Sequence, residues 1–210
     1  MVMNERPLRN SISTKSLSLM GVPKKFHRVR LSDFITNDDP ELNKVYDFVK
    51  DYIKNLNQYV RSCKGVFFYG SNGTGKTMLS CLLLKEAYRH RFSCRRITFS
   101  EYISKYTNIW GTKGAEKSEN EDKVSIYKSA EFLIIEEIGK EIDTSIAVPI
   151  LEDLMRYRED NGLTTIICTN LSPTKFREFY GNSLFSIIQG NLTPVEMVFN
   201  DHRLITYKER

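Results

Sequence analysis

Residues 70–77 read GSNGTGKT and have the side chains and spacing of a phosphate-binding loop. Two glycines frame the loop, and Lys76 and Thr77 follow the second one, which is the P-loop pattern. Glycines let backbone N–H groups turn toward an anion where a Cβ would intrude. Lys76 would reach the terminal phosphates as a point charge, and Thr77 would offer its hydroxyl to Mg²⁺. The alternative, a glycine-rich structural turn, is disfavoured because the loop follows an apolar strand and opens a helix.

These considerations predict a site for ATP or ADP with Mg²⁺. The residues expected to hold the nucleotide are Gly70, Ser71, Asn72, Gly73, Thr74, Gly75, Lys76, Thr77 and Met78.

Two adjacent acids, Glu136 and Glu137, end the apolar run EFLII some 60 residues later. A strand carrying them beside the loop would leave the sheet where the phosphates sit. We predict that Glu136 and Thr77 serve the metal, Glu136 through water. Glu137 is expected to orient or deprotonate the attacking water. The alternative is a pair of exposed glutamates at a strand end.

Asn170 follows the β-branched run LTTIICT and gives a third polar side chain at a strand end. Taken alone, an Asn in this position is more often a turn residue. With the loop and the acids in the same order along the chain, we interpret it as a group that holds the attacking water. The predicted catalytic set is therefore Lys76, Glu137 and Asn170.

The elements that must carry these residues alternate between strands and helices, which predicts an α/β fold with a mostly parallel sheet flanked by helices. Ser172 and Pro173 have the residue types of a helix start, and Gly181 should lie past that helix's end. The polar stretch 111–123 is expected to be a surface loop. The expected strands are 65–69, 95–99, 131–135 and 163–169, with one or two more in the tail, and the expected helices include 77–90, 145–159 and 182–189.

Charge is concentrated near the start of the chain. Residues 1–30 hold seven Lys and Arg side chains against one acid, Glu5, whereas the whole chain has a net charge of +5. We predict a flexible basic arm over 1–20 and an ATP-binding domain over 21–210. Such an arm suits nucleic acid or an acidic protein, and the alternative is a solvated tail without a partner. No run reaches 18 apolar residues, so no membrane span is expected.

The chain resembles the AAA+ ATPases of the DnaC/DnaI helicase-loader group and the related IstB type. The segments that carry the resemblance are GVPKKFHRVRLSDF, KGVFFYGSNGTGKTML, YKSAEFLIIEEIGKE and RYREDNGLTTIICTNLS, within about residues 21–205. The resemblance implies a P-loop NTPase with an AAA+ core in the cytoplasm of a bacterial or phage-infected cell. It also implies a replicative helicase, a hexameric one, and single-stranded DNA as partners, and a homo-oligomer formed with ATP.

Three features of the chain depart from that group. Its first acid is usually Asp where this chain has Glu136. Its trans-acting arginine follows a serine, but here Ser186 is followed by Ile187, so weak ATP hydrolysis is expected, with Arg177 as a weakly supported substitute. The chain also offers only a short segment where the loaders have a folded helicase-binding region. Arg203 matches an arginine near the family's C-terminus and is either a nucleotide sensor or an ordinary surface residue.

Three functions follow. The leading one is an ATP-switched loader that binds the replicative helicase and single-stranded DNA. The alternatives are an IstB-like ATP-dependent transposition helper and a weakly hydrolysing, nucleotide-bound adaptor of another ATPase.

Overall fold

A computed structural model describes residues 8–9, 11–141 and 144–197 of the chain. Its elements, in chain order, are α1 (Thr14–Leu19), the 3₁₀ turns η1 (Lys24–Phe26) and η2 (Leu31–Asp33), α2 (Pro40–Lys54), α3 (Leu56–Arg61), β1 (Gly65–Tyr69), α4 (Lys76–Arg89), β2 (Cys94–Thr98), α5 (Phe99–Thr107), α6 (Gly114–Lys128), β3 (Phe132–Ile138), α7 (Thr144–Asp160), β4 (Thr164–Thr169), α8 (Pro173–Asn191) and β5 (Leu192–Glu196).

The five strands form one parallel sheet in the order β2-β3-β4-β1-β5. In its centre, Ile167 of β4 pairs with Phe67 of β1 on one side and with Ile135 of β3 on the other. Because neighbouring parallel strands end at the same edge, the segments that follow β1, β3 and β4 meet there. Such an edge is where open α/β sheets bind ligands.

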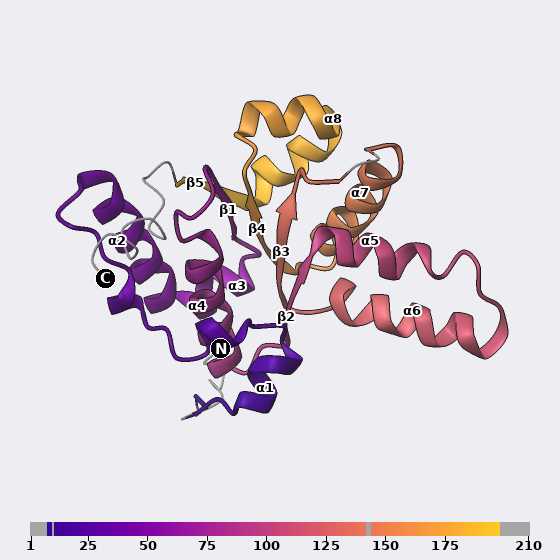
Figure 1. Ribbon diagram of the computed structural model, residues 1–210, viewed down its shortest axis with the longest axis horizontal. Helices are drawn as coiled ribbons and strands as arrows, with labels where there is room; N and C mark the ends of the chain where they lie inside the picture. Colours follow the sequence, from indigo (N-terminus) through magenta and orange to yellow (C-terminus); the bar gives the residue numbers. More distant parts are fainter. Residues whose placement is uncertain (1–7, 10, 142–143, 198–210) are drawn as a thin grey trace, which may run out of the picture.

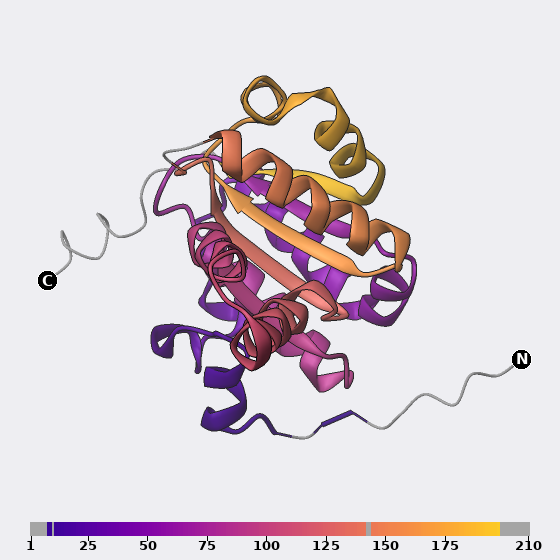
Figure 2. The same cartoon turned by 90° about the vertical axis from the view of Figure 1, so that its right-hand side faces the viewer.

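Helices cover both faces of the sheet, as Figures 1 and 2 show. Side chains alternate across a strand, so Val66 and Phe68 of β1 pack with α2, α3 and α4, whereas Phe67 packs with α7 and α8. Each face therefore has its own apolar core. Strands buried on both faces explain the nearly uninterrupted apolar runs in the sequence.

A buried arginine fixes the opposite end of the sheet. Arg158 of α7 is fully buried, and its guanidinium donates to Thr165 Oγ1 at 2.8 Å, Thr164 O at 2.6 Å and Ala130 O at 2.8 Å. It therefore ties together the points where β3 and β4 begin. Holding these two strands at their beginnings also sets where they end, beside the phosphate-binding loop.

Most of the expected elements are confirmed. The strand predicted at 65–69 is β1 without change, and the other three predicted strands differ by at most three residues at either end. Ser172 caps α8 and Pro173 opens it. Gly181, with φ 84° and ψ 167°, breaks α8 into two helical pieces, so a helix ending before Gly181 and a second one after it were correctly expected.

The surface loop predicted for 111–123 was wrong, because most of it belongs to helix α6. Lys117 and Glu121 lie 3.8 Å apart, and Glu119 and Lys123 lie 2.8 Å apart, both at the i, i+4 spacing that stabilises helices. Val124 is the one buried residue of α6. Without an apolar stripe, the helical period was invisible, and the polar composition indicated a loop. In Figure 1, α5 and α6 form a hairpin that projects from the body.

The arm predicted for 1–20 also differs from the structure in its last part. Residues 14–19 form α1, which Ser13 caps, and Leu17 and Met20 are buried in the core beside α4. The helix is too short for its apolar spacing to stand out in the sequence. Residues 1–7 and 10 of the expected arm, and the tail at 198–210, lie outside the described residues. No helix within the described ranges has the length and apolar character needed to cross a bilayer.

Two leucines of α1 test whether this segment belongs to the domain. Leu17 is 5% exposed and Leu19 is 67% exposed. We expect Leu17→Ala to lower the free energy of unfolding by about 2–5 kcal/mol, as for other buried leucines. The same change at Leu19 should alter it by less than about 0.5 kcal/mol. Urea denaturation of both variants measures the difference, and equal effects would contradict the packing of α1.

Candidate nucleotide-binding site

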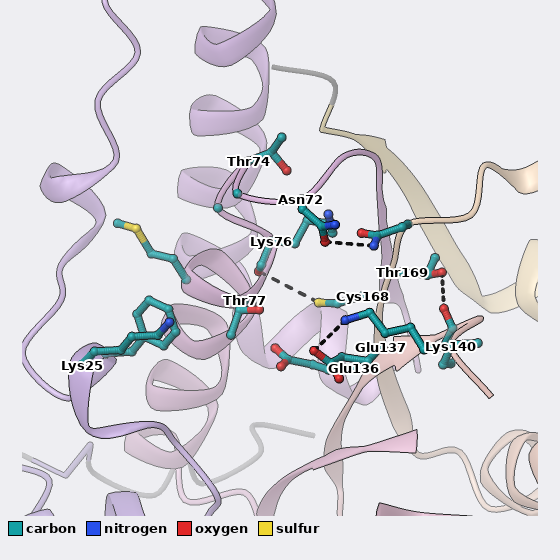
Figure 3. A pocket seen from close by; sticks show the side chains of 16 residues that line it. Lys25, Asn72, Thr74, Lys76, Thr77, Glu136, Glu137, Lys140, Cys168 and Thr169 are labelled. Carbon is teal, nitrogen blue, oxygen red and sulfur yellow. Dashed lines mark hydrogen bonds and ion pairs between the residues drawn. The ribbon is translucent and has the colours of Figure 1, made fainter. Parts of the chain in front are cut away.

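One cavity of about 560 Å³ opens at the edge where β1, β3 and β4 end (Figure 3). It contains Lys76, Glu137 and Asn170 together, although these residues lie far apart in the sequence. Gly70 and Ser71 begin the loop without lining the cavity. The residues around it are Lys25, Phe26, Asn72, Gly73, Thr74, Gly75, Lys76, Thr77, Met78, Glu136, Glu137, Ile138, Lys140, Cys168, Thr169 and Asn170.

The loop between β1 and α4 is held in a conformation that requires glycine. Gly70 has φ +134°, and a Cβ placed on it would lie 2.3 Å from the carbonyl oxygen of Met197. Gly75 has φ +95° and directly precedes α4. Thr74 is fully buried, and its hydroxyl donates to Ser71 O at 3.0 Å across the loop. The loop is thus shaped by its own contacts, with the N-terminus of α4 directed at its centre.

Lys76 is the first residue of α4, and its ammonium group turns back over the loop. Nζ donates to Gly70 O at 2.8 Å and to Ser71 O at 2.6 Å. Two carbonyl oxygens therefore satisfy the ammonium, which remains at the cavity wall. An ammonium group has three donors and no acceptor, so a phosphate could replace these carbonyls as its partner.

Glu136 is buried at the end of β3, and its carboxylate has two neighbours. Arg96 of β2 forms an ion pair with Oε2, and Ser80 Oγ lies 3.3 Å from Oε1. Thr77 lines the same cavity. Oxygen donors of this kind suit Mg²⁺. Among the described residues, no cluster of three or more His, Cys, Asp or Glu side chains could hold a metal alone, so Mg²⁺ here would also need oxygens from a nucleotide.

Glu137 is the extra residue of a β-bulge. Glu136 pairs with Cys168 and Ile138 with Thr169, which leaves Glu137 between them with φ +63°. A strand without this bulge would point its successive side chains to opposite faces, whereas here both acids line the cavity. The Glu137 carboxylate is exposed and accepts from Lys140 Nζ at 3.0 Å, as Figure 3 shows.

Asn170 connects the end of β4 to the phosphate-binding loop. Its Nδ2 donates to Asn72 Oδ1 at 2.9 Å, across 98 residues of sequence. Just before it, Thr169 Oγ1 donates to Ile138 O at 2.6 Å and joins β4 to the bulge. Asn170 is thus more than an isolated turn residue, although its catalytic role stays a prediction.

Sequence reasoning missed several residues of this cavity. Lys25 and Phe26 lie about 50 residues before the loop and form one wall, with Lys25 Nζ 4.9 Å from the centre of the Phe26 ring. Lys140 and Arg96, which contact the two acids, also belong to no recognisable sequence motif.

Cys168 lines the cavity as a free thiol, and burial, reinforced by the nearby Glu136 charge, raises its pKa well above the ordinary value. It is therefore no nucleophile at neutral pH.

The side chain at the position expected for a trans-acting arginine, Ile187, is buried. Ile187 is 7% exposed and packs in the core formed by α7 and α8. Arg177 is exposed on α8, and its Nε donates to Asn182 Oδ1 at 2.5 Å. Arg203 lies outside the described residues. Neither the buried isoleucine nor its neighbour Ser186 can replace a cation.

The backbone of Glu137 yields a prediction about stability. A left-handed conformation costs a non-glycine residue about 1–2 kcal/mol, and glycine adopts it freely. We expect Glu137→Gly to raise the free energy of unfolding of the nucleotide-free protein by about 1 kcal/mol relative to Glu137→Ala. Both variants lack the carboxylate, so urea denaturation isolates the backbone term. An alanine variant as stable as the glycine variant would show that the bulge is not strained.

Comparisons with known proteins agree with this architecture. No protein-family model matches the chain. The replicative helicase loader DnaI of Bacillus subtilis is 23% identical over 143 residues, which is 68% of this chain and 44% of DnaI. The chain thus spans less than half of that relative's length.

Solved structures show the fold. The DnaC helicase loader superposes with a TM-score of 0.71 at 19% identity, over 83% of this chain and 99% of that one. DnaA of Aquifex aeolicus bound to AMPPCP gives 0.63 at 22% identity, over 89% of this chain and 55% of the other. The expected α/β class, with a mostly parallel sheet flanked by helices, is therefore confirmed, and the fold is shared with DnaC and DnaA. In sequence, the chain is similar to the helicase loader DnaI.

Proposed function

We propose that this protein is an ATP-binding helicase loader for DNA replication. The observation that carries the proposal is the convergence of Lys76, Glu136, Glu137 and Asn170 on one cavity beside a phosphate-binding loop. The similarity to a replicative helicase loader supports the choice of partner. The proposed partners are a replicative helicase, hexameric in assembly, and single-stranded DNA, with a homo-oligomer forming in the presence of ATP.

In this proposal, each part of the nucleotide would contact a different group of residues in the cavity. The loop's N–H groups and Lys76 would bind the phosphates, and Thr77 and Glu136 would hold Mg²⁺. The apolar surfaces of Phe26 and Met78 would contact the base at the other end. When bound, Mg²⁺ would neutralise charge that develops on the phosphates. Glu137 would accept a proton from the attacking water, which Asn170 would orient.

Binding would act as a switch because each polar group already has an internal partner. Lys76 contacts loop carbonyls, Asn170 contacts Asn72, and Glu137 contacts Lys140. A γ-phosphate would attract Lys76, Lys140 and Asn170 together and rearrange the segments that carry them. Loss of that phosphate would restore the internal contacts, so partners that recognise either arrangement would bind in only one nucleotide state.

A second candidate function is a nucleotide-bound adaptor that hydrolyses ATP weakly. The burial of Ile187 favours it, because an arginine finger contributes a factor of about 10³–10⁵ to turnover in related NTPases. An IstB-like transposition helper would use the same cavity. The DNA that is bound distinguishes these alternatives.

Nucleotide binding should depend on Lys76. Hydrogen bonds to charged groups contribute about 1.5–3 kcal/mol, so Lys76→Ala should weaken ATP binding about tenfold to a hundredfold. Titration with a fluorescent ATP analogue measures this affinity. Lys44→Ala is the matched control, since Lys44 is an exposed lysine of α2 that pairs with Glu41. Equal affinities of the two variants would refute the assignment of the site.

DNA binding at one fixed salt concentration tests the function. Single-stranded and duplex oligonucleotides would be titrated with ATP–Mg²⁺, with ADP and without nucleotide, because phosphate contacts make affinity steeply dependent on salt. We expect ATP to favour single strands. Assembly on duplex with ATP would instead support the transposition helper. Absence of DNA binding in every state would support the adaptor.

A further inference from the structure

The N-terminal segment forms hydrogen bonds with the outer strand of the sheet at Arg96 of β2. The backbone N–H of Arg96 donates to Met20 O at 2.8 Å, and its Nη1 donates to Gly21 O at 3.0 Å. Gly21 has φ +84°, and a Cβ placed on it would lie 2.5 Å from Arg96 O. Both the main chain and the side chain of Arg96 therefore contact Met20 and Gly21.

The other end of the same guanidinium binds the proposed metal ligand. Nη2 of Arg96 pairs with Glu136 Oε2, and the two side chains are 14% and 4% exposed. Ser80 Oγ lies 3.3 Å from the second oxygen of Glu136. The buried carboxylate thus has its own counter-charge in the protein. Arg96 Nε is also buried and has no hydrogen-bond partner among the described residues. The contacts of the guanidinium therefore run from Nη1 to Gly21 and from Nη2 to Glu136.

This pair changes the electrostatics of the nucleotide site. A bare Glu136 would repel the phosphates of ATP until Mg²⁺ neutralised it, whereas a Glu136 already paired with Arg96 presents little net charge. Charges in a partly buried site interact strongly because water screens them poorly. Mg²⁺ should therefore add less to nucleotide affinity in this protein than it would beside an unpaired carboxylate.

We propose that Arg96 is a positioning residue that neutralises and orients Glu136, so that nucleotide binding depends only weakly on Mg²⁺. The contact with Gly21 sets the direction of the guanidinium and thereby links the N-terminal segment to the metal side of the cavity. This inference rests on the proposed function, because it requires that the cavity binds a nucleotide.

The test compares nucleotide affinity in excess Mg²⁺ with affinity in excess EDTA, using a fluorescent ATP analogue. The ratio of the two dissociation constants is the readout, and thermal melting checks that each variant is folded. We expect a ratio below about threefold for the wild type and above about tenfold for Arg96→Gln, which leaves the Glu136 charge uncompensated. The change should come from weaker binding in EDTA, with binding in Mg²⁺ nearly retained.

Three further variants separate the effect of the Arg96 charge from the effect of its position. Arg95→Gln is the matched control, because Arg95 lies next in the same strand and its Nη1 donates to Cys94 O instead. It should keep the wild-type ratio. Arg96→Lys restores a positive charge near Glu136 and should lower the ratio again. Gly21→Ala retains every charge but displaces the segment against Arg96 O, so we expect an intermediate ratio.

The outcomes are distinct for the two proposals. A wild type that binds no nucleotide in either condition would overturn the proposed function and this inference with it. A wild type that binds only with Mg²⁺ would leave the function intact and overturn the inference. A folded Arg96→Gln with an unchanged ratio would also overturn it. If Arg96→Gln fails to fold, the ratios of dissociation constants for the wild type and for Arg96→Lys decide the question. A ratio for Arg96→Lys that is about tenfold higher than that of Arg95→Gln would contradict charge compensation.

Discussion

The parallel pairing of β3, β4 and β1 is the constraint on which the site depends. β4 lies between the strand that precedes the phosphate-binding loop and the strand that carries the acids, and it contributes Asn170 from its own end. Apolar side chains buried on both faces fix the register of these strands, because a slip of one residue would exchange the two cores. Arg158 holds β3 and β4 together where they begin. Packing far from the cavity thus determines which polar groups meet inside it.

Three charged side chains that line the cavity at the strand ends each have an internal partner of complementary character. Glu136 faces Arg96, Glu137 faces Lys140, and the ammonium of Lys76 rests on two carbonyls. These three charged groups are therefore already engaged in internal contacts where a nucleotide would bind. Binding at such a site exchanges one set of contacts for another, so its net affinity reflects a difference between two arrangements.

The sequence predicted the central strands and the loop because both have strong local signatures. GVFFY is a continuous apolar run, and the glycines of residues 70–75 occupy backbone conformations that other residues avoid. Helix α6 escaped prediction because pairs such as Glu119 and Lys123 stabilise it without an apolar stripe. The contacts of Phe26 and Arg96 with the site were also beyond prediction, since they arise from tertiary packing between segments distant in sequence. The bulge at Glu137 belongs to the same class, because nothing in EFLIIEEIG indicates the extra residue.

The contacts of Met20 and Gly21 with Arg96 have a consequence for the behaviour of the protein in solution. β2 is an outer strand of the sheet, and outer strands offer unpaired N–H and C=O groups that can recruit a strand from another molecule. By occupying the backbone N–H of Arg96 and bringing a positive-φ glycine against its carbonyl, the N-terminal segment interrupts that row of groups in its middle. The same short segment that contacts the Arg96–Glu136 pair therefore also protects the sheet from edge-to-edge aggregation.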